Sequence, residues 1–198
     1  MINFSNNSSH EPYKILRTKY SQARSKKQES IQAISISSYS NIRKEVNSRL
    51  VNLKYIINEE FIFFTNYNSP KALEFDSHDQ ISAILFWPAI NSQIRLKAKI
   101  TKTSEDFNND YFRTRSYEKN ALAISSNQSS KISSFEDVEK NFNEVKKSKD
   151  LSKCPEYWGG YSFTPFYFEF WEGHKSRLNR RDVYYIMDDK WEHQILQP

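Results

Sequence analysis

The residues best suited to chemistry lie together near the end of the chain, between Trp158 and Arg181. This stretch reads WGGYSFTPFYFEFWEGHKSRLNRR, and its aromatic side chains alternate between two faces from 161 to 171. A period of two predicts a long β-strand. Cationic side chains follow the strand, at Lys175, Arg177, Arg180 and Arg181. Rings to stack on and guanidinium groups suit a planar, anionic ligand. A core strand followed by a solvated basic loop is the plainer alternative.

Two further places combine positive charge with a predicted helix. The sequence SPK at 69–71 is a helix-start signal that places Lys71 in the first turn. A helix N-terminus with a lysine beside it is a plausible anion site, although most helix starts bind nothing. Tyr111, Arg115 and Lys119 recur at intervals of four. On one continuous helix they would share a face and could hold a phosphate, or they could form an ordinary surface stripe.

A basic pair also marks the predicted strand 49–57. Arg49 and Lys54 are separated by an odd number of positions, so in a regular strand they face opposite sides. One could reach a ligand from the strand face, and the other from the strand edge or a bulge.

Other familiar sites are missing. The four histidines have no metal-ligand spacing, the GxGxxG, phosphate-loop and GxSxG motifs are absent, and Cys154 is the only cysteine.

The elements that must position these residues follow from periodicity. We expect a frayed N-terminus over 1–10, and helices over 11–26, from 70, over 104–115 with Ser104 as the cap, and from 135 with a capping box of Ser133 and Glu136. Strands are predicted at 31–37, 49–57, 61–66, 81–87 (buried on both faces), 93–102, 161–171, 183–187 and 191–196. Short turns join most of them, which favours a small antiparallel barrel with peripheral helices.

The composition is that of one globular domain. The 198 residues are 15% aromatic and carry a net charge of +5, which favours anionic partners. Acidic residues are interleaved throughout, so no basic stripe for nucleic acid stands out. No apolar run is long enough for a membrane span and no secretory signal is present, so we expect a cytoplasmic protein without membrane or nucleic-acid partners. We divide it into a polar segment and helix, 1–30, and a single domain, 31–198, with a helical insert at 104–150.

Several short motifs in order resemble the pyridoxine/pyridoxamine 5'-phosphate oxidase family. The matching pieces are RLVNLK at 49–54, FFTNYNSPKA at 63–72, Gln93, YFRTR at 111–115, SNQSS at 126–130, WGGY at 158–161, EFWEG at 169–173 and RLNRR at 177–181. The resemblance runs from about residue 30 to Pro198. It implies an α+β, mainly antiparallel split β-barrel that binds FMN, and a homodimer with flavin sites at the subunit interface.

The resemblance also implies roles for individual residues. The flavin phosphate and its ribityl chain would be bound by Arg49, Lys71, Gln128, Ser129 and Arg181. The remaining flavin contacts would come from Leu50, Val51, Asn52, Leu53, Lys54, Phe64, Thr65, Gln93 and Trp171. The phosphate of the substrate would be bound by Lys54, Tyr111, Arg115 and Lys119. Arg177 would lie over the substrate ring, with Asn179 beside it as the second catalytic position.

Some positions depart from the family pattern. Asn179 and Arg180 replace a His and an Asp, and Lys119 replaces a phosphate-binding Ser. Ser116 replaces a Pro, and Pro70 replaces a basic residue. Lys119 or an unpaired Arg180 could still hold a phosphate by charge. Asn179 can donate or accept a hydrogen bond but cannot become a cation. The flavin set therefore keeps the pattern better than the substrate set does.

The expected activity is an FMN-dependent oxidase. By resemblance, it would convert pyridoxamine or pyridoxine 5'-phosphate to pyridoxal 5'-phosphate, with O2 as acceptor and H2O2 as product, and with no metal. One alternative is a flavin oxidase of the same fold with another substrate, such as a phenazine precursor. A non-catalytic FMN-binding or storage protein is a third possibility, and a basic nucleic-acid-binding module without flavin is a fourth.

Overall fold

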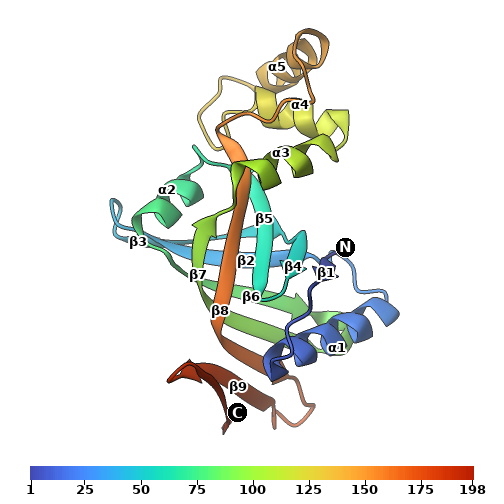
Figure 1. Ribbon diagram of the computed structural model, residues 1–198, viewed down its shortest axis with the longest axis vertical. Coiled ribbons are helices and arrows are strands. Elements are labelled where there is room, and N and C mark those ends of the chain that lie inside the picture. Colours follow the sequence, from blue (N-terminus) through green and yellow to red (C-terminus); the bar gives the residue numbers. More distant parts are fainter.

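A computed structural model describes residues 1–198, which form one ten-stranded, mostly antiparallel sheet with five α-helices around it (Figure 1). The strands follow the order β1-β4-β5-β8-β7-β6-β2-β3, and β9 and β10 extend the sheet from β8. The elements are β1 (Asn3–Ser5), α1 (Glu11–Ser25), β2 (Ala33–Ser40), β3 (Glu45–Asn52), β4 (Tyr55–Ile57), β5 (Glu60–Asn66), α2 (Pro70–Ser77), β6 (Gln80–Trp87), η1 (Pro88–Ile90), β7 (Ser92–Lys102), α3 (Glu105–Arg113), α4 (Tyr117–Ser125), α5 (Phe135–Ser148), β8 (Trp158–Glu172), β9 (Arg180–Met187) and β10 (Lys190–Leu196). This confirms the predicted split barrel.

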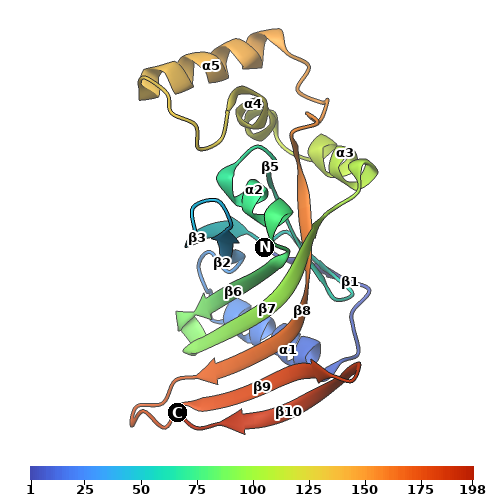
Figure 2. The ribbon, with the colours of Figure 1, turned by 90° about the vertical axis from the view of Figure 1, so that its left-hand side faces the viewer.

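The aromatic strand β8 is the longest element of the sheet and runs from one end of the molecule to the other (Figure 2). Its first half pairs with β5, its second half pairs with β9, and β7 pairs along most of its length. A bulge leaves Phe166 without a partner between Pro165 and Tyr167. At about 3.3 Å per residue, β8 spans roughly 45 Å. Helices α3, α4 and α5 lie at one end of it, and β9 and β10 lie at the other.

The barrel core is strongly aromatic and includes the N-terminus of the chain. A cluster of 26 buried residues contains Phe61, Phe163 and Phe168 from the strands and Tyr13 from α1. Tyr13 packs edge-on against Phe168 with ring centroids 5.0 Å apart. Ile2 is 5% exposed, and β1 pairs in parallel with β4. The prediction of a frayed N-terminus was therefore wrong, because an isolated three-residue strand shows no periodic pattern in sequence.

Other predictions need local corrections. The strand expected over 49–57 is broken at Leu53 and Lys54 into β3, which pairs with β2, and β4, which pairs with β5. Strand β6 is buried on one face only, since Phe86 is 55% exposed. Helix α5 is capped by Ser134, not Ser133. Ser104 does cap α3 as predicted, by accepting from the Phe107 N–H. No helix is both long and apolar enough to cross a membrane.

Candidate functional site

A cleft opens where the start of β8 meets α3, α4 and the broken strand β3–β4. It has a volume of about 360 Å³, which is in the range of small-molecule sites. It is lined by Leu50, Val51, Asn52, Lys54, Phe64, Thr65, Lys71, Tyr111, Arg115, Lys119, Gln128 and Trp158. All of these except Trp158 were predicted as flavin or substrate residues. The structure therefore brings most of the predicted site together within one chain.

One side of the cleft is a cluster of cations formed by Lys54, Arg115 and Lys119. None of the three forms a salt bridge with a carboxylate. Burial, together with the charges of Lys119 and Arg115, lowers the pKa of Lys54. Burial also lowers the pKa of the Arg115 guanidinium. Three cations in one cleft without a carboxylate partner favour the binding of an anion between them, and a phosphate group is such an anion.

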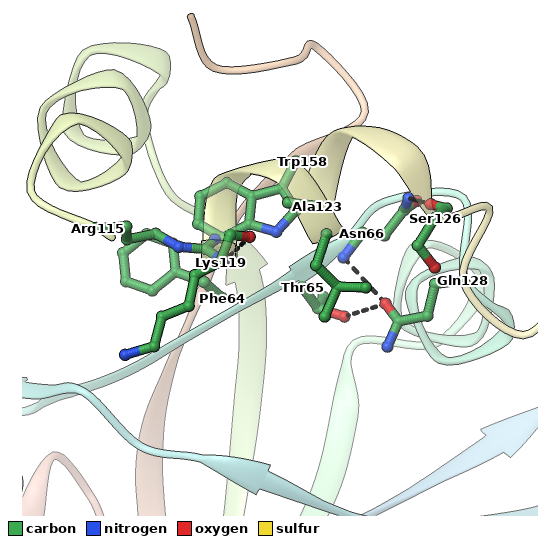
Figure 3. Close-up of a pocket in the computed structure, with 10 residues that line it drawn as sticks. Phe64, Thr65, Asn66, Arg115, Lys119, Ala123, Ser126, Gln128 and Trp158 are labelled. Carbon is green, nitrogen blue, oxygen red and sulfur yellow. Dashed lines mark hydrogen bonds between the residues drawn. The ribbon is translucent and has the colours of Figure 1, made fainter. Parts of the chain in front are cut away.

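The other side is a wall of nearly parallel aromatic rings formed by Phe64, Tyr111 and Trp158, of which Figure 3 draws Phe64 and Trp158. The rings of Phe64 and Tyr111 stack with centroids 3.7 Å apart, and Phe64 lies 5.3 Å from Trp158 at an interplanar angle of 9°. The Arg115 guanidinium lies 4.2 Å from the centre of the Trp158 ring. This cation–π contact fixes the position of the charge at the cleft. The wall offers a flat apolar surface directly beside the cation cluster.

Tyr111 lies on α3, Arg115 lies in the connection that follows it, and Lys119 lies on α4. Helix α3 ends at Arg113, and α4 begins after Ser116. The condition of one continuous helix is therefore not met. The Arg115 Nη2 group donates to the Lys119 carbonyl across the break, at 2.8 Å. The break therefore keeps these side chains in the same cleft.

Two glycines of β8 allow α3 to approach the sheet. A Cβ atom on Gly159 would lie 2.1 Å from the Tyr67 hydroxyl, and one on Gly160 would lie 2.5 Å from Thr103 Oγ1. The Gly160 N–H donates to Asn108 Oδ1 on α3 at 2.7 Å, and the Gly160 carbonyl accepts from the Tyr67 hydroxyl at 3.0 Å. The WGGY sequence is thus explained by close approach of a helix to the strand that carries Trp158.

A second polar group surrounds the buried Lys71, at the start of α2. Its Nζ donates to Thr65 Oγ1 at 3.0 Å and to Ser69 Oγ at 3.1 Å. Burial, followed by the nearby charge of Arg49, lowers the pKa of Lys71 to about 8. The Gln128 Oε1 atom accepts from the Thr65 hydroxyl at 3.1 Å. A lysine, hydroxyls and an amide converging at a helix start form a suitable cradle for a phosphate.

Three predicted flavin residues lie differently from the rest. Arg49 donates from Nη2 to Glu74 at 2.8 Å and also donates to Ser38 Oγ, so its charge is already partly compensated. Leu53 is fully buried in the core, and its N–H donates to the Gln32 carbonyl at 2.9 Å, so it does not line the cleft. Ser129 has a φ of 69° and lies in a neighbouring pocket beside the start of α2. Leu50 and its neighbours lie on the exposed strand β3, and Leu50 itself is 72% exposed.

The remaining predicted residues lie at the opposite end of β8. Gln93, Trp171 and Arg181 are direct neighbours across β7, β8 and β9. Arg181 donates from Nε to Glu169 at 2.9 Å, and Arg95 donates to the same carboxylate at 2.9 Å. Trp171 lies roughly 40 Å along β8 from Trp158. Within one chain, this group does not reach the cleft.

The loop between β8 and β9 carries Arg177 and Asn179. Arg177 has a φ of 64°, and the Asn179 Oδ1 atom accepts from the His174 N–H at 3.0 Å, so the amide holds the loop in shape. Arg180 is not unpaired, although that was the condition for it to hold a phosphate by charge. It donates from Nε to Asp182 at 2.6 Å, and this contact raises its pKa. The unpaired role proposed for Arg180 therefore fails, because an Asp two residues on neutralises it.

Sequence reasoning missed some residues that shape the site. Trp158 lines the cleft, and the Gly-Gly pair that follows it was the available signal. Asn66 and Ser126 line the adjoining pocket shown in Figure 3, where the Asn66 N–H donates to Gln128 at 3.3 Å. Asn66 is the last residue of β5 and Ser126 is the C-cap of α4, and no periodicity marks polar residues at the ends of elements. No group of three or more His, Cys, Asp or Glu residues is placed to hold a metal ion.

Comparison with solved structures defines the class of protein. PhzG from Burkholderia lata, in complex with tetrahydrophenazine-1-carboxylic acid, superposes with a TM-score of 0.87 at 24% identity, covering 95% of this chain and 93% of that one. A pyridoxamine 5'-phosphate oxidase-related, FMN binding protein from Nostoc punctiforme gives a TM-score of 0.78 at 13% identity, covering 96% and 99%. The fold is that of the split-barrel FMN-binding proteins.

Sequence comparison then narrows the class. The pyridoxine/pyridoxamine 5'-phosphate oxidase of Leptospira biflexa is 33% identical over 95% of this chain and 89% of its own length. That of Rippkaea orientalis is 34% identical over 95% and 90%. Residues 158–198 match the family model described as the pyridoxine 5'-phosphate oxidase C-terminal dimerisation region. The chain belongs to the pyridoxine/pyridoxamine 5'-phosphate oxidase family.

Proposed function

We propose that this protein is an FMN-dependent oxidase that converts pyridoxine or pyridoxamine 5'-phosphate to pyridoxal 5'-phosphate. The observation that carries the proposal is the cation cluster of Lys54, Arg115 and Lys119 beside the ring wall of Phe64 and Trp158. A phosphorylated aromatic ring has the two features that these surfaces complement. The names of the related oxidases support the same reaction class.

The residues around Lys71 fit the phosphate end of FMN. Lys71 is 8% exposed and hydrogen-bonded to hydroxyls only, so it supplies a cation that no carboxylate cancels directly. Thr65 and Gln128 line the same cleft, and Leu50 to Asn52 extend from it along an exposed strand. An isoalloxazine ring can lie against such a strand while its ribityl phosphate reaches the start of α2.

FMN held around Lys71, Thr65 and Gln128 would supply the hydride acceptor for C4' of the substrate, with O2 as the final electron acceptor and H2O2 as product. The protein's own groups supply position and electrostatics. Lys54, Tyr111, Arg115 and Lys119 bind the substrate phosphate, and this contact orients the ring. Arg177 lies over the ring, orients it and helps to hold developing charge, and Asn179 shapes the loop that presents Arg177. With the amine substrate, water hydrolyses the released imine to the aldehyde and ammonia.

The active unit that we propose is a homodimer. The cleft lies at one end of β8, and Arg177, Arg181 and Trp171 lie at the other. A twofold arrangement of two chains can bring the second group of one chain to the cleft of its partner. The match of 158–198 to a dimerisation region supports this arrangement.

The test is an anaerobic titration of the purified protein with pyridoxine 5'-phosphate. We expect a yellow flavin spectrum that bleaches with substrate and returns when air is admitted, with release of H2O2. A yellow protein that no vitamer bleaches would leave FMN binding in place and reject the substrate. A colourless protein that takes up no added FMN would reject the cofactor as well.

A related oxidase acting on another substrate is the second candidate. Lys119 adds a third cation to the cluster with Lys54 and Arg115, and Asn179 cannot carry a charge, so two of the predicted substrate positions differ in charge from the family pattern. In that case FMN binds and an anionic aromatic acid, not a phosphorylated vitamer, bleaches it. Titration with tetrahydrophenazine-1-carboxylic acid under the same conditions separates the two candidates.

A further inference from the structure

The N-terminal strand β1 lies directly against the backbone that carries Lys54. The Asn3 N–H donates to the Lys54 carbonyl at 2.9 Å, and β1 then pairs in parallel with β4 from Tyr55 to Ile57. The Asn58 N–H donates to the Ser5 carbonyl at 2.9 Å and closes the far end of the pairing. A segment far from the cleft in sequence is thus bonded to a residue that lines it.

Lys54 needs this support because it sits in a break in the sheet. Neither Leu53 nor Lys54 belongs to a strand, so regular pairing does not fix them. The Lys54 N–H donates to the Ile62 carbonyl at 2.8 Å, and Asn3 satisfies its carbonyl. The like charges of Arg115 and Lys119 also repel the Lys54 ammonium in the absence of an anion. Backbone bonds on both sides hold Lys54 in place against that repulsion.

Strand β1 is itself firmly anchored. The Ile2 N–H donates to the Tyr20 hydroxyl at 2.9 Å, and the rings of Phe4 and Tyr20 lie 4.9 Å apart. Helix α1 continues this anchoring, because Lys19 pairs with Glu172 at the end of β8. The Ser8 hydroxyl donates to Glu59 at 2.8 Å, beyond β4. Because β1 is anchored in this way, its bond to the Lys54 carbonyl can hold the Lys54 backbone in place.

We propose that β1 positions Lys54 for anion binding, and that the Asn3 backbone N–H is the positioning group. Loss of this donor leaves the Lys54 carbonyl unpaired and frees the segment after Leu53 to shift. The lysine then makes a poorer contact with the phosphate, whereas the flavin cradle around Lys71 is unaffected. The identity of the natural ligand rests on the proposed function, but the positioning of Lys54 does not.

The test compares Asn3→Pro with Asn3→Ala in the full-length protein. Proline removes the N–H, and alanine keeps it while deleting the exposed side chain. We expect Asn3→Pro to raise the KM for pyridoxine 5'-phosphate and the Kd for inorganic phosphate roughly three- to tenfold, the effect of one lost hydrogen bond. The kcat and the bound flavin content stay as in the wild type, and Asn3→Ala leaves all four quantities unchanged.

A double-mutant cycle with Lys54→Met separates positioning from general destabilisation. In the Lys54→Met background, Asn3→Pro should have no further effect on phosphate affinity, since its action passes through Lys54. An equal effect in both backgrounds, or equal behaviour of the Pro and Ala variants, overturns the proposal. If Asn3→Pro does not fold, Tyr20→Phe, which removes the hydroxyl that holds Ile2, takes its place in the same cycle.

Phosphate binding also keeps this inference distinct from the oxidase proposal. If the wild type oxidises no vitamer but binds phosphate through Lys54, the proposed function fails and the Asn3 comparison still decides the inference. If Lys54→Met binds phosphate as the wild type does, Lys54 is not an anion ligand. The positioning role of β1 is then overturned as well.

Discussion

Arg115 contributes both to the positive charge of the cleft and to its aromatic stacking. Its guanidinium stacks on Trp158 and donates to the Lys119 carbonyl, and its charge adds to that of Lys54. The stacking leaves other N–H donors of the fork free for an anion. A lysine at this position would keep the charge and lose the stacking, so the two residues are not equivalent here.

Substitution of Arg115 tests the substrate phosphate site. Arg115→Ala should raise the KM for pyridoxine 5'-phosphate roughly tenfold to a hundredfold, because a charge-assisted hydrogen bond is lost. FMN should stay bound, since its cradle lies around Lys71. Steady-state kinetics and the visible spectrum measure the two effects. Arg113→Ala is the matched control, because Arg113 is paired with Asp110 and points to solvent. Unchanged kinetics in Arg115→Ala would remove it from the site.

The titration of Lys71 predicts how flavin binding depends on pH. Its folded pKa of about 8 means that Lys71 is cationic below pH 8 and neutral above it. The FMN phosphate is already dianionic at pH 7, so its own charge does not change in this range. The Kd of the apoprotein for FMN should therefore rise roughly tenfold between pH 7 and pH 9. Fluorescence quenching of FMN measures it, and Lys71→Arg should flatten the profile. A wild-type profile that is already flat would contradict the assignment.

At the scale of elements, the two glycines at the start of β8 decide whether α3 can bring Tyr111 to the cleft. Gly159→Ala would place a Cβ against the hydrogen-bonded pair of Tyr67 and Asn108. We expect a loss of about 1–3 kcal/mol in the free energy of unfolding, the usual cost of overpacking. Thermal unfolding measures it, and the KM for the vitamer should rise as well. Gly173→Ala at the other end of β8 is the control, since the three atoms nearest to its Cβ belong to the exposed Asn91 side chain, which can move aside. A melting temperature lowered equally there would contradict the packing argument.

Local sequence patterns predicted the elements that local interactions define. The hairpin of β9 and β10, the alternation of β7 and the Ser104 cap all depend on neighbouring residues, and they were found where expected. The break at Lys54 and the pairing of β1 with β4 depend on distant partners, and periodicity carries no information about them. The end of α3 at Arg113 was missed because the spacing of four continues across two helices.

The sequence predicted those residues of the candidate site that belong to the recognised motifs. The cleft contains the residues from the RLVNLK, YFRTR and SNQSS sequences, which are distant in the chain and were linked by resemblance alone. Motifs do not show which side chains pair with one another. The neutralisation of Arg180 by Asp182 and the use of Asn179 inside its own loop follow from side-chain geometry, to which motif spacing is blind.

At the scale of the whole molecule, the two halves of the proposed site are separated by most of the length of β8. Complementation between variants tests whether two chains combine them. Lys54→Met removes a group at one end, and Arg177→Ala removes one at the other. Each variant alone should be nearly inactive when assayed below the KM. A dimer with one chain of each kind has one cleft with both native groups, so randomly paired, co-expressed variants should recover about a quarter of the wild-type activity.

Two outcomes of the complementation experiment would contradict the proposed dimer. If the mixture is as inactive as its components while sedimentation shows dimers, the two residues do not act in one shared cleft. If sedimentation shows monomers of 23.6 kDa and the wild type is active, the twofold arrangement is rejected. Co-purification of differently tagged chains confirms that mixed dimers are present in the tested sample.

The bulge at Phe166 bends β8 between its two ends. Residues before it pair with β5, residues after it pair with β9, and the extra residue shifts one set against the other. Because Lys97 pairs with Tyr167 and Ala98 pairs with Pro165, deleting Phe166 would leave both halves of β8 on their present faces, but it would remove the local bend and twist that the bulge adds. Phe166 lies far from both half-sites. Through the bend that it adds, it therefore affects the angle between the two ends of β8, and with it the fit of one end to the partner chain in the proposed dimer.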